Sequence, residues 1–415
     1  MIGITPVRGG LKELKESVLG GEMCAACGAC VGLCPYIQCV EDRVAAVAEC
    51  RKAEGRCFLF CPRAHPPDEE APVESLLEFA PEIGPYRRVL QGRSAFSATG
   101  AARKTGVEVA GAQHGGTVTA LLVQAFRSGL VKAAVLTRLR HGRPETYIAR
   151  SEAEVLAAAG SKFAVAPTVA EVNQAILRED LKDLPLAVVA LPCQAAALKR
   201  IRGVAAARET VRPAAGSGSA EDPNGTPAAS WLARPFPNIA LIIGLFCTWA
   251  LSQQGWLRVL ELARGLSPHQ GTSGQEVASE VRRVEIPPPP ANTLEVTFAD
   301  GSLAQVSLEK VRPHIRTGCR VCADMTSECA DVSIGLVEGR AGWNTVLTRS
   351  ERGDALVRDA EDAALVEVEP LDRGRLSHLA EASLGKRRRA VATAAAQGRE
   401  LPYLRQEGKR GSHHA

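Results

Sequence analysis

The stretch of sequence that decides the fold is LPLAVVALPCQAAALKRI, residues 184–201. It begins with a continuous apolar run that stops at Pro192, and a helical pattern follows from Gln194. NIALIIGLFC, residues 238–247, has the same arrangement, because its buried run also ends at a cysteine. Continuous apolar strands that are each followed by a helix are typical of parallel strands covered on both faces. The sequence therefore predicts an α/β main domain with a mostly parallel or mixed sheet.

The segments on either side support this class of fold. TVTALLVQAFRSG, residues 117–129, has the apolar spacing of a helix, and LVKAAVLTRL, residues 130–139, is a short run suited to a buried strand. Residues 281–309 alternate between apolar and polar around Asp300-Gly301, which is typical of a β-hairpin.

Composition excludes several classes of protein. The chain has 415 residues, of which 46% are hydrophobic and 23% are charged, and this suits two or three folded domains. The net charge of +4 does not indicate a nucleic-acid-binding protein. The longest apolar run, residues 239–251, is too short to cross a bilayer, and the N-terminus lacks an apolar signal region. We therefore expect a cytoplasmic protein with no membrane span.

Changes in composition along the chain predict four parts. A Pro-rich acidic stretch marks a linker, and a segment rich in Ala, Gly, Ser and Pro marks a mobile insertion in the main domain. The C-terminal part is basic and contains KRRR at residues 386–389, which we expect to face solvent. The predicted parts are a small α+β ferredoxin-like domain at 1–68, a linker at 69–85, the α/β domain at 86–373 with the insertion at 205–237, and a C-terminal helix and tail at 374–415.

The cysteine content is the unusual feature of the composition. The chain has 13 cysteines. Disulfides are the common use of dense cysteine in small secreted domains, so the absence of a signal region favours metal binding here. The alternative, small buried apolar residues, stays open for a lone cysteine such as Cys329.

The first cysteine run has the spacing of a bacterial ferredoxin. CAACGACVGLCP, residues 24–35, is a C-x2-C-x2-C-x3-C-P run. Three closely spaced thiolates can reach three corners of one iron–sulfur cube, while the fourth points to a neighbouring cube. We expect Gly28 to let the backbone pass close to the cube, with structural zinc as the competing interpretation. Ferredoxin pairing then predicts a first 4Fe-4S cluster on Cys24, Cys27, Cys30 and Cys61.

The partner half of the ferredoxin pattern is altered. The C-x3-C-P ending at Cys57 and Cys61 is intact, but the usual early C-x2-C pair is missing. Cys39 is then the one nearby thiol left to complete a second cluster, and without it the second site is incomplete. The predicted second set is Cys34, Cys39, Cys50 and Cys57.

Four further cysteines are brought together by the expected fold. Cys193 and Cys247 each follow a predicted parallel strand, and the carboxyl ends of such strands meet at the edge where α/β proteins bind their ligands. Cys319 and Cys322 form a C-x2-C pair. These four residues could hold a third 4Fe-4S cluster, with zinc as the alternative.

Six motifs of the chain occur together in one order. They are HGGTVTALLVQAFRSG (114–129), GSKFAVAPT (160–168), LPCQAAALKRI (191–201), IGLFC (243–247), GCRVCADMTSECADVSIG (318–335) and GWNTVLTRSERG (342–353). With these motifs the chain resembles the coenzyme F420 hydrogenase/dehydrogenase beta-subunit family, in the family's order, from about residue 20 to about residue 390.

The resemblance implies an oxidoreductase subunit with FAD and two or three 4Fe-4S clusters. It implies electron transfer between a partner redox subunit, of the hydrogenase, formate dehydrogenase or heterodisulfide reductase-like kind, and a two-electron carrier such as the deazaflavin coenzyme F420. The altered second ferredoxin half and the segment at 205–237 depart from the family pattern. A flavin-free adaptor that only carries electrons within a larger complex is the alternative function.

The sequence has no G-x-G-x-x-G fingerprint for a flavin. A helix N-terminus with two glycines could hold a phosphate, and a lysine near a flavin ring could stabilise negative charge. The candidate cofactor-binding residues are His114, Gly115, Gly116, Thr117, Ser161, Lys162 and Asp324. Two glycines at a helix start are also common in plain turns, and Lys162 could equally be a solvated surface residue.

Overall fold

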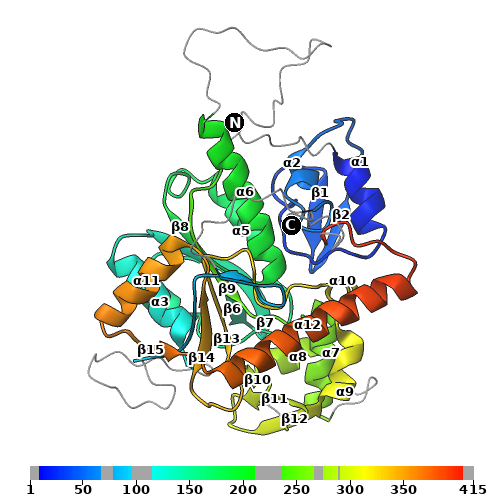
Figure 1. Cartoon of the computed structure of the whole chain (residues 1–415). Helices are drawn as coiled ribbons and strands as arrows, with labels where there is room; N and C mark the ends of the chain where they lie inside the picture. The colour runs from blue at the N-terminus through cyan, green and yellow to red at the C-terminus, as the bar shows by residue number, and fades with distance from the viewer. Residues whose placement is uncertain are drawn as a thin grey trace, which may run out of the picture.

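A computed structural model of the chain describes residues 9–66, 78–95, 115–210, 235–265, 274–287 and 290–404 (Figure 1). Within these ranges no helix is both long enough and apolar enough to cross a membrane.

A mixed eight-stranded sheet forms the centre of the molecule. In spatial order its strands are β15 (Val366–Pro370), β5 (Arg88–Ser94), β14 (Asn344–Thr348), β13 (Val332–Leu336), β9 (Ile239–Leu245), β8 (Leu186–Ala190), β6 (Ala133–Arg140) and β7 (Arg143–Ala149). The strands β6, β8, β9 and β13 run parallel, and the strands outside them pair antiparallel. The predicted α/β class with a mixed sheet is therefore confirmed.

Helices cover both faces of this sheet because its central strands are apolar on both sides. On one face Leu241 and Ile243 of β9 pack with α3 (Thr117–Arg127), α4 (Glu152–Ala157) and α11 (Glu351–Asp362). On the other face Ile242 packs with α5 (Thr168–Ala175) and α6 (Pro192–Thr210). The alternation of buried contacts along one strand explains why the apolar runs in the sequence are continuous.

The N-terminal segment forms a small unit beside the sheet. Its elements are α1 (Leu11–Leu14), a π-helical turn η1 (Lys15–Leu19), β1 (Ile37–Val40), β2 (Arg43–Ala46) and α2 (Arg56–Leu59). The strands β1 and β2 pair with each other and take no part in the main sheet. Figure 1 shows this unit, in blue, beside the C-terminal end of α12 (Arg373–Ala396).

A second small sheet packs at the other end of the molecule. Its strands are β10 (Val281–Glu285), β11 (Thr293–Phe298) and β12 (Leu303–Ser307), so the predicted hairpin is present and gains a third strand. The neighbouring helices are α7 (Gln253–Ala263), α8 (Gly274–Ser279), α9 (Leu308–Val311), a 3-10 turn η2 (Arg312–His314) and α10 (Thr317–Arg320). Trp256 and Phe298 are buried at the centre of this layer.

Three of the predicted boundaries look different in the structure. Residues 78–85 of the expected linker, together with Tyr86, form a hairpin of β3 (Glu78–Ala80) and β4 (Gly84–Tyr86), while residues 69–77 lie outside the described ranges. Helix α6 extends to Thr210, so the start of the expected insertion is helical, and residues 211–234 are outside the described part. The C-terminal helix is present, but its buried residues Ser383, Lys386, Ala390 and Ala394 show that it does not simply face solvent.

Candidate iron–sulfur and flavin site

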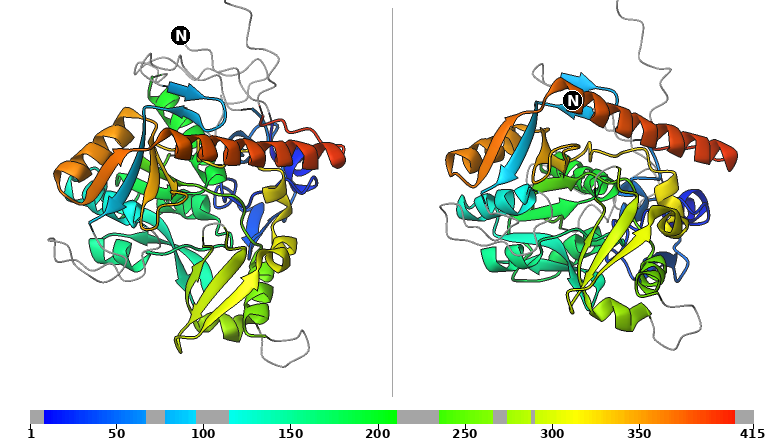
Figure 2. Two further views of the ribbon diagram at one scale, coloured as in Figure 1. Left: turned by 60° about the horizontal axis from the view of Figure 1, so that its bottom comes forward. Right: turned by 90° about the horizontal axis from the view of Figure 1, so that it is seen from below.

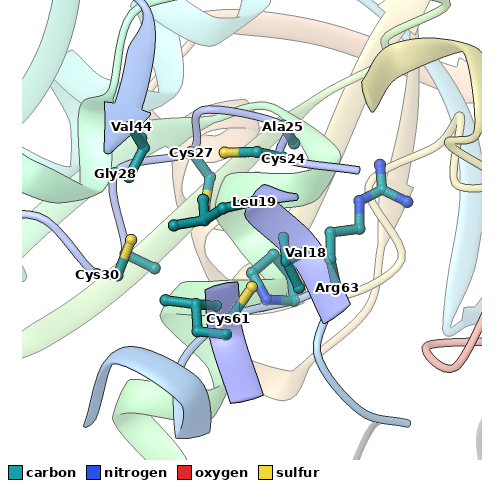
Figure 3. A pocket seen from close by; sticks show the side chains of 13 residues that line it. Val18, Leu19, Cys24, Ala25, Cys27, Gly28, Cys30, Val44, Cys61 and Arg63 are labelled. Carbon is teal, nitrogen blue, oxygen red and sulfur yellow. The ribbon is translucent and has the colours of Figure 1, made fainter. Parts of the chain in front are cut away.

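Four cysteines of the N-terminal segment line one cavity (Figure 3). They are the residues predicted to hold the first cube, Cys24, Cys27, Cys30 and Cys61. The rest of the wall is mostly apolar and includes Leu14, Val18, Leu19 and Val44. Thiolates gathered in an apolar cavity suit an iron–sulfur cluster, because low solvent exposure is one of the properties that set the potential of such clusters.

Electrostatics in this cavity favour neutral thiols in the metal-free chain. Burial, together with the neighbouring Cys61, raises the pKa of Cys27 to about 12. Burial also raises the pKa of Cys61 to about 11, although Arg200 and Arg63 act in the opposite direction. Cysteine must lose its proton to bind metal, so an incoming cation would supply the charge that stabilises these thiolates.

The loop that carries these cysteines is fixed against α5. The amide of Asn173, which is buried, donates to the carbonyl oxygens of Val31 at 2.8 Å and Ala29 at 3.1 Å. The carbonyl of Cys27 accepts a hydrogen bond from the backbone N–H of Val169 at 3.0 Å. Helix α5 therefore holds the cysteine loop in place through main-chain contacts.

Gly28 lines the same cavity as the four cysteines, and it also packs against α5. Its φ is +90°, and a Cβ atom there would lie 2.5 Å from the carbonyl oxygen of Pro167 and 2.6 Å from the nitrogen of Ala170. The close approach is to the start of α5. Glycine is required because the loop must pack against this helix in a left-handed conformation.

The second cysteine group is only partly assembled. Burial and the neighbours Cys34 and Cys50 raise the pKa of Cys57 to about 11. These three residues were predicted to share a cluster, and all three belong to the same packed cluster of the N-terminal unit.

Cys39, the predicted fourth member, lies in different surroundings. It is on β1, opposite Val44, and its thiol points to the carbonyl oxygen of Glu41 at 3.6 Å. Burial and the neighbours Cys24 and Asp42 raise its pKa to about 11. The one cysteine among its electrostatic neighbours, Cys24, belongs to the first group, and the assignment of Cys39 to the second cluster stays a prediction.

The four remaining candidate ligands converge at one edge of the main sheet. Cys193 is in the first turn of α6 after β8, and Cys247 follows β9, so both lie beyond the carboxyl ends of parallel strands. Cys319 is in α10, and Cys322 follows this short helix. We call Cys193, Cys247, Cys319 and Cys322 the central cysteine group.

The members of the central cysteine group influence one another's pKa values. The pKa of Cys193 is raised well above its usual value by burial and by Cys27, Cys322 and Cys319. Burial raises the pKa of Cys247 to about 12, and Cys319 and Cys322 add to this effect while Lys386 opposes it. These mutual effects are consistent with the predicted meeting of the strand ends and the C-x2-C pair, and the shared ligand set stays a prediction.

Cys322 differs from the other members. Burial acts to raise its pKa, but Lys386 and Arg63 outweigh burial, and the pKa is lowered. A thiol that loses its proton more easily is a better metal ligand near neutral pH.

The segments that carry the first and the central cysteine groups are in contact. Cys27 is the neighbouring thiol that raises the pKa of Cys193 most. A Cβ atom on Gly318 would lie 2.3 Å from the carbonyl oxygen of Cys24. Arg316, two residues before Gly318, forms a buried ion pair with Asp42 in the turn between β1 and β2. The N-terminal unit therefore docks where the central cysteine group lies.

Among the described residues, no three His, Cys, Asp or Glu side chains are placed to hold a single metal ion. A four-iron cube presents its irons at separate corners, so its thiolates do not need to meet at one atom.

The candidate phosphate site lies at the same edge of the sheet as the central cysteine group. Gly115 and Gly116 precede α3, and a Cβ atom on Gly115 would lie 2.5 Å from Oδ1 of Asn344. Thr117 donates through its hydroxyl to the same Oδ1 atom at 2.9 Å. His114 lies outside the described residues.

The other candidate cofactor residues are held by the protein itself. The ammonium of Lys162 donates to the carbonyl oxygens of Ala158 and, at 2.7 Å, Gly160, which follow α4. Lys162 is partly buried, and burial lowers its pKa to about 8. Ser161, next to it, is partly buried.

The side chain of Asp324 forms hydrogen bonds within its own loop. Its carboxylate accepts hydrogen bonds from the backbone N–H groups of Ser327 at 2.8 Å and Glu328 at 3.1 Å. The carboxylate thus shapes the loop after Cys322, and the backbone carbonyl of Asp324 faces Lys386.

Sequence reasoning missed Lys386 as a residue of the site. It was expected to face solvent as part of KRRR, yet it is 4% exposed and contacts the central cysteine group. Its position follows the spacing of the other buried residues of α12, at 383, 390 and 394. A search for helical periodicity of small residues, and not for charge, would have placed Lys386 on the buried face.

Comparisons with known proteins agree with this architecture. Residues 99–172 match the family model described as coenzyme F420 hydrogenase/dehydrogenase, beta subunit N-term, and residues 184–374 match the model of its C terminus. The F420-reducing [NiFe] hydrogenase complex from Methanosarcina barkeri contains a chain of the same fold. That chain is 22% identical with a TM-score of 0.59, and the match covers 79% of this chain and 100% of that one.

Relatives of known name are redox proteins. The coenzyme F420-dependent sulfite reductase of Methanocaldococcus jannaschii is 26% identical over 87% of this chain and 49% of the reductase, so this chain spans about half its length. The coenzyme F420 hydrogenase subunit beta of Methanothermobacter thermautotrophicus is 24% identical over 70% of this chain and 92% of that protein. An F420H2 dehydrogenase subunit of Methanosarcina mazei is 26% identical over 82% and 84% of the two chains. This chain is an oxidoreductase that belongs to the coenzyme F420 hydrogenase/dehydrogenase beta-subunit family.

Proposed function

We propose that the chain is an iron–sulfur flavoprotein subunit that passes electrons between a partner redox protein and coenzyme F420. The observation that carries the proposal is the contact between the segments that hold the first and the central cysteine groups. Gly318 lies against the carbonyl of Cys24, and Cys27 is an electrostatic neighbour of Cys193. Relatives named as F420-linked hydrogenase, dehydrogenase and reductase proteins support the choice of carrier.

We infer that the three cysteine groups form a series through the molecule. Two electrostatic effects support this: Cys57 of the second group raises the pKa of Cys30 of the first, and Cys27 of the first raises the pKa of Cys193 of the central group. We assign the first cluster to Cys24, Cys27, Cys30 and Cys61, and the central cluster to Cys193, Cys247, Cys319 and Cys322. The second cluster would use Cys34, Cys50 and Cys57, with Cys39 as the proposed fourth ligand.

The bound groups would supply the redox chemistry: clusters carry single electrons, and a flavin exchanges single electrons for pairs. The chain's own residues hold and shield them. Apolar side chains such as Val18 and Leu19 exclude water from the first site, and Asn173 holds the loop that presents Cys27 and Cys30. Arg316 and Asp42 keep the N-terminal unit docked against the central cysteine group.

We place the flavin at the carboxyl edge of the main sheet. The glycines before α3 would face its phosphate, since helix N-termini attract anions through their N–H groups and positive dipole, although the N–H of Thr117 donates to Oδ1 of Asn344 at 3.4 Å. Gly115, Gly116 and Thr117 are the proposed contacts, with His114, Ser161, Lys162 and Asp324 as further candidates. Electrons would then leave the central cysteine group at the edge of the sheet where the flavin lies.

The test uses full-length protein purified without oxygen. Acid release should yield flavin, identified by its absorbance. Reduced coenzyme F420 should then reduce a one-electron viologen dye in the presence of the protein. Each oxidised F420H2 gives up two electrons, so two dye molecules should be reduced per F420H2.

Two controls separate the alternatives. With NADH in place of reduced F420 the dye should stay oxidised. If NADH reduced the dye faster than reduced F420 does, NADH and not F420 would be the carrier. Protein that carries iron and acid-labile sulfide but no flavin, and that is inert toward F420H2, would contradict the proposal and identify an electron-transfer adaptor.

A further inference from the structure

Two buried cations from opposite ends of the chain meet at the central cysteine group. Lys386 belongs to the C-terminal helix α12 and is 4% exposed. Arg63 follows α2 in the N-terminal unit and is 3% exposed. Figure 2 shows α12 running across the molecule until its end lies beside the N-terminal unit. Burial of an ammonium and a guanidinium is costly unless negative charge compensates them.

Lys386 is bonded to the loops that carry the candidate ligands. Its Nζ atom donates to the carbonyl oxygen of Cys247 at 2.6 Å and to that of Asp324 at 2.7 Å. These two acceptors use two of the three N–H donors of the ammonium. The carboxylate of Asp324 is already bonded to backbone N–H groups, and Lys386 forms no ion pair with a carboxylate within the described ranges.

Arg63 is bonded to the same region from the other side. Its two terminal nitrogens donate to the carbonyl oxygens of Val321 at 3.3 Å and Gly318 at 3.4 Å, the residues just before Cys322 and Cys319. The guanidinium also lies 4.3 Å from the ring centre of Tyr403. Its Nε atom is buried and has no hydrogen-bond partner among the described residues.

The carbonyl contacts orient both cations but do not neutralise them. The carboxylate of Asp324 supplies part of the negative charge near Lys386, and the rest would come from four thiolates with a cube between them. A cube held by four thiolates carries a net negative charge that grows by one when an electron is added. A nearby cation therefore stabilises the reduced form more than the oxidised form, and net charge is one of the factors that set cluster potentials.

We propose that Lys386 and Arg63 raise the reduction potential of a cluster on the central cysteine group. This inference rests on the proposed function, which places a cluster there. Both residues act through charge and not as ligands. They also make the central site depend on the N-terminal unit and on α12, since each supplies one of the cations.

The experiment is a redox titration of the intact protein with dithionite, followed by electron paramagnetic resonance. The signal of the central cluster is the one that Cys319→Ser abolishes. Lys386→Gln keeps N–H donors for the two carbonyl oxygens but removes the charge. We expect at least a tenfold shift of the reduction equilibrium toward the oxidised form, which for one electron is about 59 mV to more negative potential.

Two matched variants isolate the charge. Lys386→Arg keeps the cation and should keep the potential of the native protein. Arg388→Gln removes an exposed cation from the same KRRR run and should leave the potential unchanged. Arg63→Gln should shift the potential in the same direction as Lys386→Gln. If Lys386→Gln does not fold, the same titration of Arg63→Gln tests the inference.

The outcomes distinguish this inference from the function on which it rests. A native protein without the central signal refutes the proposed cluster, and the inference falls with it. A native signal that stays at the same potential in both Lys386→Gln and Arg63→Gln overturns the inference and leaves the proposed function intact.

Discussion

Cys319→Ser should remove about four irons per chain, the content of one cube. Cys319 lies beside Cys322 and near Cys247, and its pKa is raised by burial and by Cys322. A hydroxyl is a poor substitute for a thiolate at a buried metal site, so the central cluster should be lost while the N-terminal clusters remain. Iron and acid-labile sulfide in the purified protein measure the loss. Flavin reduction by the partner should slow sharply, because a step in the electron path is gone.

Cys329→Ser is the matched control for this variant. Cys329 is ten residues further along the chain and packs against the core between the sheet, α5 and α6, and it is not among the proposed ligands. The iron content of Cys329→Ser should equal that of the native protein. Equal iron and equal electron transfer in Cys319→Ser would show that the central group holds no cluster.

Gly28→Ala should prevent assembly of the first cluster. The left-handed backbone at this position costs a residue other than glycine about 1–2 kcal/mol, and overpacking typically adds about 1–3 kcal/mol. The new Cβ atom would meet main-chain atoms of Pro167 and Ala170, which cannot rotate away. The cysteine loop should therefore leave α5. The expected result is a lower midpoint of thermal unfolding and a loss of about four irons.

Gly301→Ala separates backbone strain from the clash. Gly301 also has a positive φ, of +80°, but a Cβ atom there would meet no atom within 4 Å. This variant should lose some stability and keep all its iron. Native iron content in Gly28→Ala would mean that contact with α5 does not position the cysteine loop.

The first cysteine group was predictable because its spacing is local. Cys24, Cys27 and Cys30 lie on one tight loop, and the C-P ending at Cys61 follows the crossed pairing of ferredoxins. The structure places all four around one cavity. The central group was predictable for a different reason. Cys193 and Cys247 follow parallel strands, and the ends of such strands must meet at one edge of the sheet.

The residues that were missed or misread depend on contacts between distant parts of the chain. Position 28 must be glycine because its backbone packs against the start of α5, about 140 residues away in the chain. The spacing of cysteines within the motif cannot predict that contact. Lys386 was misread because its charge suggested solvent, whereas the face of the helix on which it lies decides its burial. Cys39 was assigned by elimination, and its place in the second cluster stays a prediction.

The central claim is that the cysteine groups of this chain hold iron–sulfur clusters. Its most direct test is the iron, acid-labile sulfide and zinc content of the full-length protein purified without oxygen. The first and the central groups together predict about eight irons with equal sulfide per chain, and a filled second group raises both to about twelve. Protein that contains stoichiometric zinc and no acid-labile sulfide would contradict the claim.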